Sequence, residues 1–153
     1  DQLPAMMDYN IRDGRTYMYA KGKPLYPFGY GLSYTQFRYT HLRTSTPTLA
    51  RDATVTVSVD VSNTGKVSGD TVVQLYVKHL ASKVSRPLEE LKGFQRVTLA
   101  PGETKTVNLT LDASQLAYWD DAQKALTVES EPVSLMIGQS SADITLSQTI
   151  KVE

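Results

Sequence analysis

The sequence predicts an all-β protein, a β-sandwich of seven or eight short strands preceded by an extended, irregular N-terminal arm. Three observations predict this class. Apolar and polar residues alternate in several short runs, turn-forming residues separate these runs, and helical periodicity appears only once and weakly. Because alternation gives each strand one apolar face, two sheets stacked face to face can bury both faces. We expect the arm to span residues 1–34 and the sandwich to span residues 35–153.

The arm has an unusual composition. Residues 1–43 contain seven of the nine tyrosines and two of the three phenylalanines, interspersed with glycine and proline. The same stretch holds six basic residues against three acidic ones. Because glycine and proline favour turns, this composition predicts extended chain and turns rather than helix.

The strand at residues 55–61 shows the clearest pattern. Valine occupies every second position from Val55 to Val61, with threonine, serine and aspartate between. A period of two places all of these valines on one face of the strand. Residues 63–66 (NTGK) then supply a turn.

The other strands follow from the same alternation. We expect them, in chain order, at residues 37–43, 71–78, 91–99, 106–111, 133–137 and 144–152. A turn at residues 100–103 ends the third of these, since Pro101 presets its φ angle and Gly102 permits a positive φ. Asp112 is expected to cap a single helical turn over residues 113–116.

Composition excludes several classes of protein. The chain has 16 basic and 16 acidic residues, and this balance argues against a nucleic acid or an anionic membrane as partner, because either would require a basic surplus. The chain contains no cysteine, so disulfides, thiolate metal sites and thiol nucleophiles are excluded. No stretch approaches about 18 consecutive apolar residues, so we expect no membrane-spanning helix.

Paired carboxylates are the groups that hydrolyse glycosidic bonds, and the chain has several candidates. Adjacent acidic residues occur at 89–90 and 120–121, but neighbours on a strand point to opposite faces and form no dyad. Glu129 and Glu131 share a face but precede Pro132 at the expected start of a strand. We expect all of these groups to be solvated loop carboxylates, because charged side chains are usually exposed.

Other catalytic and metal-binding patterns are incomplete. His41 and His79 have no neighbour at metal-ligand spacing, and we expect both at the surface or at a sheet edge. Ser33 lacks the second glycine of a nucleophile elbow, and residues 29–31 do not continue into a phosphate-binding loop. Asn108 begins a glycosylation sequon and is expected to point outward. The residues therefore predict no metal site, no cofactor and no catalytic machinery.

The aromatic rings of the arm leave two hypotheses open. Aromatic faces with polar edges stack on sugar rings, which favours a carbohydrate-binding platform. Large apolar side chains gathered on one surface also mark interfaces, which favours packing on the sandwich or on a neighbouring domain. The rings concerned belong to Tyr17, Tyr26, Phe28, Tyr30 and Tyr34.

Five blocks of the sequence resemble one known family. They are residues 15–19 (RTYMY), 24–35 (PLYPFGYGLSYT), 85–97 (SRPLEELKGFQRV), 99–104 (LAPGET) and 137–144 (IGQSSADI). Together they resemble the C-terminal fibronectin type III-like domain of family 3 glycoside hydrolases, which include β-glucosidases and β-xylosidases. The likeness covers nearly the whole chain. Residues 128–132 (VESEP) depart from it, because the family often has a Pro-Gly turn at this point.

The resemblance implies an immunoglobulin-like or fibronectin type III-like β-sandwich. It also implies structural roles for a set of motif residues, and we expect Leu91, Phe94 and Val97 to lie in a run that faces the core. The motif residues are Arg86, Pro87, Leu91, Gly93, Phe94, Pro101, Gly102 and Gly138.

The function implied by the resemblance is that of a non-catalytic structural domain. In this family the nucleophilic aspartate lies in an N-terminal barrel, and the acid/base glutamate usually lies in a following α/β domain. No residue of this chain therefore takes a catalytic role, and the chain alone is not expected to be an enzyme. Its expected partners are the catalytic domains of the same parent protein, with Arg15 pairing with a carboxylate of the neighbouring domain. The resemblance also implies a secreted or periplasmic bacterial protein.

A carbohydrate-binding module is the alternative function. It would hold an oligosaccharide on an exposed row of rings, for example Tyr30, Tyr34 and Tyr76. A role in adhesion rests on fold analogy alone. Without its neighbouring domains, the arm is expected to be the least ordered part of the chain or to form a dimer.

Overall fold

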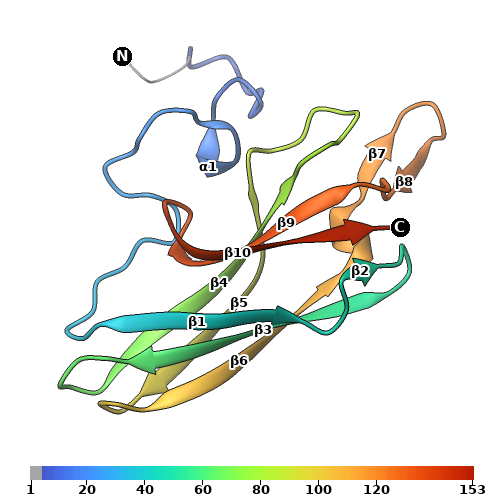
Figure 1. The fold of residues 1–153 in the computed structure, drawn as a ribbon. Helices are drawn as coiled ribbons and strands as arrows, with labels where there is room; N and C mark the ends of the chain where they lie inside the picture. Colours follow the sequence, from blue (N-terminus) through green and yellow to red (C-terminus); the bar gives the residue numbers. More distant parts are fainter. Residues whose placement is uncertain (1–4) are drawn as a thin grey trace.

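Two sheets stack face to face in the computed structural model, which describes residues 5–153 (Figure 1). The smaller sheet contains, in spatial order, β1 (Phe37–Thr44), β3 (Thr54–Asn63) and β6 (Thr104–Asp112). The larger sheet contains, in spatial order, β2 (Thr48–Leu49), β10 (Asp143–Val152), β9 (Pro132–Ser140), β4 (Gly69–His79) and β5 (Glu90–Leu99). Neighbouring strands are antiparallel except for the short β2–β10 pair. The β-sandwich and the predicted long strands are confirmed.

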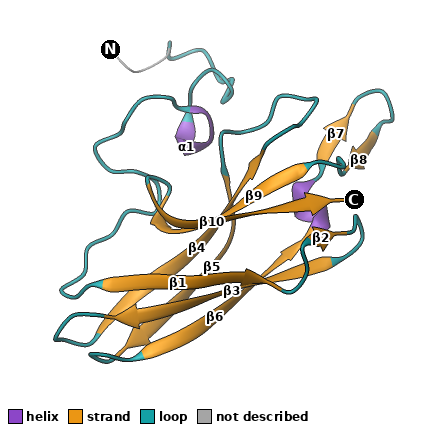
Figure 2. Cartoon of the chain, in the orientation of Figure 1, coloured by secondary structure: helices purple, strands orange, loops and turns teal. Residues whose placement is uncertain are grey.

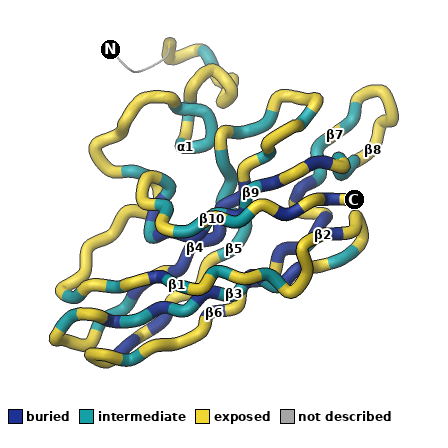
Figure 3. Tube along the Cα trace, viewed as in Figure 1, coloured by how far each residue is buried: buried dark blue, intermediate teal, exposed yellow. Residues whose placement is uncertain are grey.

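The core lies between the two sheets, where Figure 3 shows buried segments on every long strand. Alternation builds it: Val57 of β3 pairs with Leu109 of β6, and Val59 pairs with Val107. From the other sheet, Leu75, Leu135 and Ile137 are fully buried. These side chains all point inward because each sits at every second position of its strand.

Three short strands and two helical turns complete the fold (Figure 2). Strands β7 (Tyr118–Asp120) and β8 (Ala125–Thr127) form a separate hairpin. The predicted turn after Asp112 is confirmed as a 3-10 helix, Ala113–Leu116 (η1), because Asp112 accepts a hydrogen bond from the Ser114 amide. The arm was expected to lack helix, yet it forms one turn, α1 (Thr16–Tyr19). A four-residue turn is too short to show periodicity in the sequence.

The expected core position of Phe94 is wrong. Phe94 pairs with Gln74 on the outer face of the larger sheet, and 68% of its surface is exposed. Val97 is buried in the core as expected. Two residues separated by an odd number of positions along a strand point to opposite faces. Phe94 and Val97 therefore cannot lie on the same face. A bulge at Lys92 then brings Leu91 to the outer face as well.

Two of the motif glycines have clear structural reasons. A Cβ at Gly138 would lie 2.1 Å from the carbonyl oxygen of Asp143, where the β9–β10 register shifts. Gly102 adopts a φ of +73° in the turn between β5 and β6, directly after Pro101. Gly138 therefore excludes a side chain by contact with the neighbouring backbone, and the conformation of Gly102 disfavours one.

Candidate functional site

One surface of the molecule has features that an ordinary β-sandwich lacks, and we call it the arm face. We define it as the outer face of β4, β5 and β9 together with the arm and the 80–89 loop. Figure 1 shows α1 at the same end of the molecule as the loop between β4 and β5, and the rest of the arm runs from there along the side of the molecule to the start of β1. The Leu88 amide donates a 2.7 Å hydrogen bond to the Met18 carbonyl, so arm and loop are in direct contact.

An aromatic cluster joins the arm to the sheet. The Tyr17 ring stacks on Phe28, with centroids 4.1 Å apart and planes 10° apart, and meets Tyr76 edge-on at 6.1 Å. The Leu91 amide donates a 2.9 Å hydrogen bond to the Tyr17 hydroxyl. Tyr76 is fully buried beneath the arm, and this burial raises the pKa of its hydroxyl. Tyr76 therefore cannot belong to an exposed row of rings, which corrects the row expected for a carbohydrate-binding module.

Gln74 forms a second anchor between the arm and the sheet, beside a backbone hydrogen bond from Ser141 to Phe28. The Gln74 amide nitrogen donates to the carbonyls of Gly29, at 3.1 Å, and Gln139, at 2.5 Å. The Gln74 oxygen accepts a hydrogen bond from the Tyr76 hydroxyl. Gly29 has a φ of +80°, and a Cβ there would lie 2.1 Å from the Gln74 oxygen. Gly29 therefore lets the arm approach the sheet closely enough for this contact.

The outer side of the arm is apolar and uncovered. Tyr34 is fully exposed, Leu25 and Leu32 are nearly so, and Phe28 and Tyr30 are about half exposed. The Tyr26 and Tyr30 rings lie 5.5 Å apart with their planes tilted by 46°, so they do not make a flat platform. Exposed apolar side chains grouped in this way are typical of an interface.

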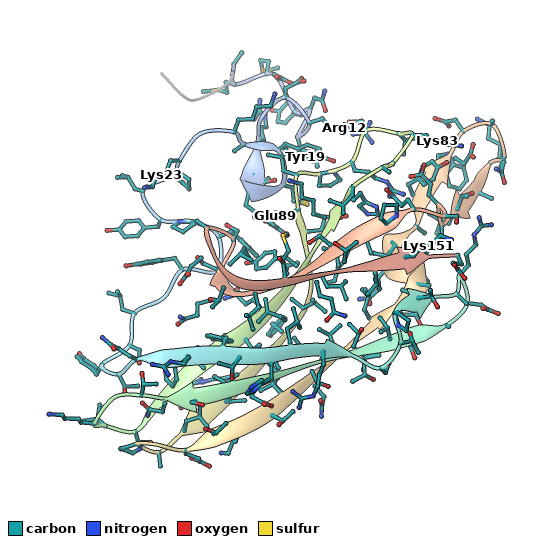
Figure 4. The ribbon with its side chains drawn as sticks, viewed as in Figure 1. Arg12, Tyr19, Lys23, Lys83, Glu89 and Lys151 are labelled. Carbon is teal, nitrogen blue, oxygen red and sulfur yellow. The ribbon has the colours of Figure 1, made fainter. Side chains whose placement is uncertain are left out.

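A hollow of about 820 Å³ lies between the arm and the sheet. Tyr17, Phe28 and Leu88 provide apolar lining, and Lys78 and Glu89 are among the charged residues that line it. Burial raises the pKa of the Glu89 carboxyl above its ordinary value, and Lys78 opposes this effect. Figure 4 shows Glu89 beside α1.

Two carboxylates clamp the 80–89 loop from the start of β9. The first is Glu131, which contacts His79 Nδ1 at 2.7 Å and accepts a 2.9 Å hydrogen bond from the Ala81 amide. The side chains of His79 and Glu131 are each only 3% exposed. The expectation of a surface histidine and a solvated glutamate is wrong here, because the end of β4 and the start of β9 pair and cover both groups.

The second carboxylate of the clamp is Glu129. It accepts hydrogen bonds from Arg86, at 3.0 Å, and from the Lys83 amide, at 2.9 Å, and also from the Ser82 hydroxyl. The Arg86 guanidinium lies over the Tyr118 ring, 4.6 Å from its centroid. Burial favours the neutral acid, but the hydrogen bonds outweigh it and hold the pKa of Glu129 below its ordinary value. Glu129 is therefore not a solvated carboxylate either.

The remaining candidates have simple structural roles. Asp120 accepts hydrogen bonds from the backbone of the β7–β8 turn, and Glu90 pairs with Lys92 at 3.3 Å. His41 is a surface residue, as expected, beside Asp60. Within residues 5–153, no group of three or more histidine, aspartate or glutamate side chains is arranged to share a metal ion. No helix in this part of the chain has the length and apolar character needed to cross a bilayer.

Arg15 contacts the arm itself. Its guanidinium donates a 3.1 Å hydrogen bond to the Ala5 carbonyl and lies 3.8 Å from a carboxylate oxygen of Asp8. Its pairing with a carboxylate of a neighbouring domain stays a prediction.

The roles of three residues important for the site and its support were not predicted from the sequence. Gln74 is an ordinary strand residue by pattern, and Tyr76 was expected only in an exposed row of rings, because the roles of both depend on the arm folding over them. Asn63, which the turn motif does include, is buried and donates to the carbonyls of Val67, at 2.8 Å, and Leu99, at 3.0 Å. The turn motif was therefore the only available clue to this third residue.

The fold and these motifs define a fibronectin type III-like domain, and the sequence profile of that family matches residues 71–141. The chain resembles this family of domains in its fold and over this stretch of its sequence. Its relatives are β-glucosidases and β-xylosidases, which confirms the resemblance to the fibronectin type III-like domain of family 3 glycoside hydrolases.

Individual relatives show how much of such an enzyme the chain represents. It is 46% identical over 140 residues to thermostable β-glucosidase B of Acetivibrio thermocellus, a match that covers 91% of this chain and 18% of the relative. It is also 46% identical over 123 residues to the periplasmic β-glucosidase of Salmonella typhimurium, covering 79% of this chain and 16% of that protein.

A solved structure of a relative is likewise matched over only a small share of its length. A β-glucosidase from Erythrobacter marinus superposes with a TM-score of 0.80 at 37% identity, covering 91% of this chain and 18% of that one. The chain therefore spans less than a fifth of the length of these relatives.

Proposed function

We propose that this chain is the non-catalytic structural domain of a β-glycosidase and that its arm face packs against the catalytic portion of the parent protein. The observation that carries the proposal is the arm itself. It is fixed to the sheet through Tyr17 and Gly29, yet it turns apolar side chains such as Leu32 and Tyr34 outward. Covering these side chains would remove apolar surface from water and stabilise both parts of the parent.

The chemistry of the chain supports the same proposal. The carboxylates Glu129 and Glu131 are engaged by Arg86 and His79, and Asp120 caps a turn. These contacts occupy the groups that a glycosidase would need as acid and nucleophile. Hydrolysis of the glycoside would then belong to the catalytic portion of the parent. We also infer that the parent is exported, which the periplasmic relative supports.

A paired substitution tests the packing role. In the parent protein, Leu32→Ser with Tyr34→Ser should lower Tm, because both side chains become buried only when the catalytic portion is present. In this 153-residue chain alone the same pair should leave Tm unchanged, since both residues are exposed. Leu126→Ser is the matched control, because Leu126 is an exposed leucine of the β7–β8 hairpin, away from the arm in Figure 1. An unchanged parental Tm would contradict the proposal.

Titration of the isolated chain tests the carbohydrate-binding alternative. Cello-, xylo- and laminari-oligosaccharides should leave the amide NMR spectrum unchanged up to millimolar concentration, because Tyr76 is buried and the Tyr26 and Tyr30 rings are tilted apart. Saturable shifts that map to the arm would favour a binding module instead. Sedimentation equilibrium of the same sample measures the self-association expected of an uncovered arm.

A further inference from the structure

Unpaired cations gather on the arm face although the chain as a whole is neutral. Lys21, Lys23 and Lys78 line the hollow, and Arg12 and Lys83 lie at the same end of the molecule (Figure 4). Within the described residues, none of these five side chains lies within 4.0 Å of a carboxylate. The chain has equal numbers of acidic and basic residues, so this is a local excess of positive charge.

Few negative charges oppose these cations. Glu89 lines the hollow beside Lys78, but it is partly buried and burial opposes its ionised form. Asp8 of the arm is already beside Arg15, and Asp13 accepts a hydrogen bond from the Asn10 side chain. The acidic pair of the β7–β8 hairpin, Asp120 and Asp121, lines a separate hollow with Arg12 and is engaged in the turn.

The hollow combines this charge with an apolar lining. Phe28, Leu88 and Met136 contribute to it, and the uncovered Leu25 and Tyr26 continue the apolar surface along the arm. A small ligand would fill the hollow and leave this continuation exposed. A polypeptide segment can cover both, with apolar side chains in the hollow and carboxylates beside the lysines.

We propose that the hollow receives an acidic, apolar segment of the catalytic portion of the parent, whose carboxylates pair with Lys21, Lys23 and Lys78. This inference rests on the proposed packing role of the arm face. The charges would set the register and orientation of the two parts more than the strength of their association. Because the lysines are exposed at the edge of the contact, salt should weaken their contribution.

Zero-length crosslinking in the intact parent tests the partner directly. A water-soluble carbodiimide joins a lysine amine to a carboxylate in contact with it, forming an amide with loss of water. Mass spectrometry should find Lys21, Lys23 or Lys78 joined to an aspartate or glutamate of the catalytic portion. Lys105 of β6 in the smaller sheet, which pairs with Glu103, is the internal control and should crosslink only within this domain. Lysines of the hollow that join no carboxylate outside this domain would overturn the inference.

Charge reversal separates this inference from the packing role on which it rests. Lys21→Glu, Lys23→Glu and Lys78→Glu together should lower the Tm of the parent at low salt, with a smaller loss at high salt. The control is reversal of Lys66, Lys105 and Lys124, which should change the parental Tm little. If the serine pair at Leu32 and Tyr34 lowers the parental Tm but the triple reversal does not, the acidic partner is wrong and the packing role stands. If neither lowers it, both fail.

Discussion

Buried charge is the most informative feature at the scale of single residues. The clamp on the 80–89 loop places Glu129, Glu131 and Arg86 in positions with little access to water. Glu129 pairs with Arg86, Glu131 contacts His79 Nδ1, and both carboxylates also accept backbone hydrogen bonds, which offset the cost of burial. Removing one partner therefore leaves the other uncompensated.

Glu129→Gln should destabilise the isolated chain by about 1–3 kcal/mol, the range for a buried polar group deprived of its partner. The amide keeps the size of the side chain but removes the charge that faces Arg86. Urea unfolding gives the free energy directly. Glu153→Gln breaks an exposed pair with Lys151 and should cost no more than about 1 kcal/mol. Equal effects of the two substitutions would argue against a buried clamp.

The same residue predicts a pH dependence. The pKa of Glu129 is lower in the folded chain than its ordinary value of 4.5. Its stabilising contribution is therefore fully present above pH 4.5 and is lost as the pH falls through the folded-state pKa. The free energy of unfolding should decline more steeply below pH 4.5 in the wild type than in Glu129→Gln. Parallel profiles would show that Glu129 does not titrate with folding.

Phe94 shows how a residue can be misplaced by pattern alone. Since its side chain is on the outer face, Phe94→Ala should cost the isolated chain less than about 1 kcal/mol. Leu99→Ala on the same strand removes a fully buried side chain and should cost about 2–5 kcal/mol. Thermal unfolding compares the two. If Phe94→Ala lowered the stability as much as Leu99→Ala, Phe94 would have to lie in the core after all.

At the scale of elements, a repeated pattern in the sequence predicts a strand. Short features, and features that depend on residues far away in the sequence, cannot be predicted in this way. β3 was predictable because its valines alternate without interruption. The turn α1 and the bulge at Lys92 were not, because neither extends over enough residues to form a pattern. The burial of His79 depends on β9, which pairs with β4 only in the folded chain.

The two anchors of the arm make a further prediction at this scale. Gly29→Ala should loosen the arm and cost about 1–2 kcal/mol, because a positive φ is unfavourable for alanine and its Cβ meets Gln74. Gly31→Ala is the matched control, since no atom lies within 4 Å of the position of its Cβ. Limited proteolysis should cut the arm faster in the first variant only. Equal cutting rates in both variants would argue against the anchor at Gly29.

At the scale of the whole molecule, the sandwich does not depend on the arm for its core. Every residue of the core cluster lies at position 37 or beyond. Removing residues 1–34 should therefore leave a chain that still unfolds cooperatively, with a lower Tm because Tyr76 and Leu91 lose their cover. Calorimetry measures the cooperativity of unfolding and the Tm. The shortened chain should also bind more of a hydrophobic dye than the full chain does. Loss of cooperative unfolding would show that the arm is part of the folding unit.

The chain has one tryptophan, Trp119, which lies on the β7–β8 hairpin. Its indole N–H donates a hydrogen bond to the Asp121 carboxylate. The arm contributes only tyrosine and phenylalanine. Emission excited at the red edge of the absorption band therefore reports on the hairpin alone. Near-ultraviolet circular dichroism sums all aromatic side chains, so the difference between this chain and one that lacks residues 1–34 contains the signal of the arm, including the stacked rings of Tyr17 and Phe28. The hairpin can thus be followed directly and the arm by difference, without any label.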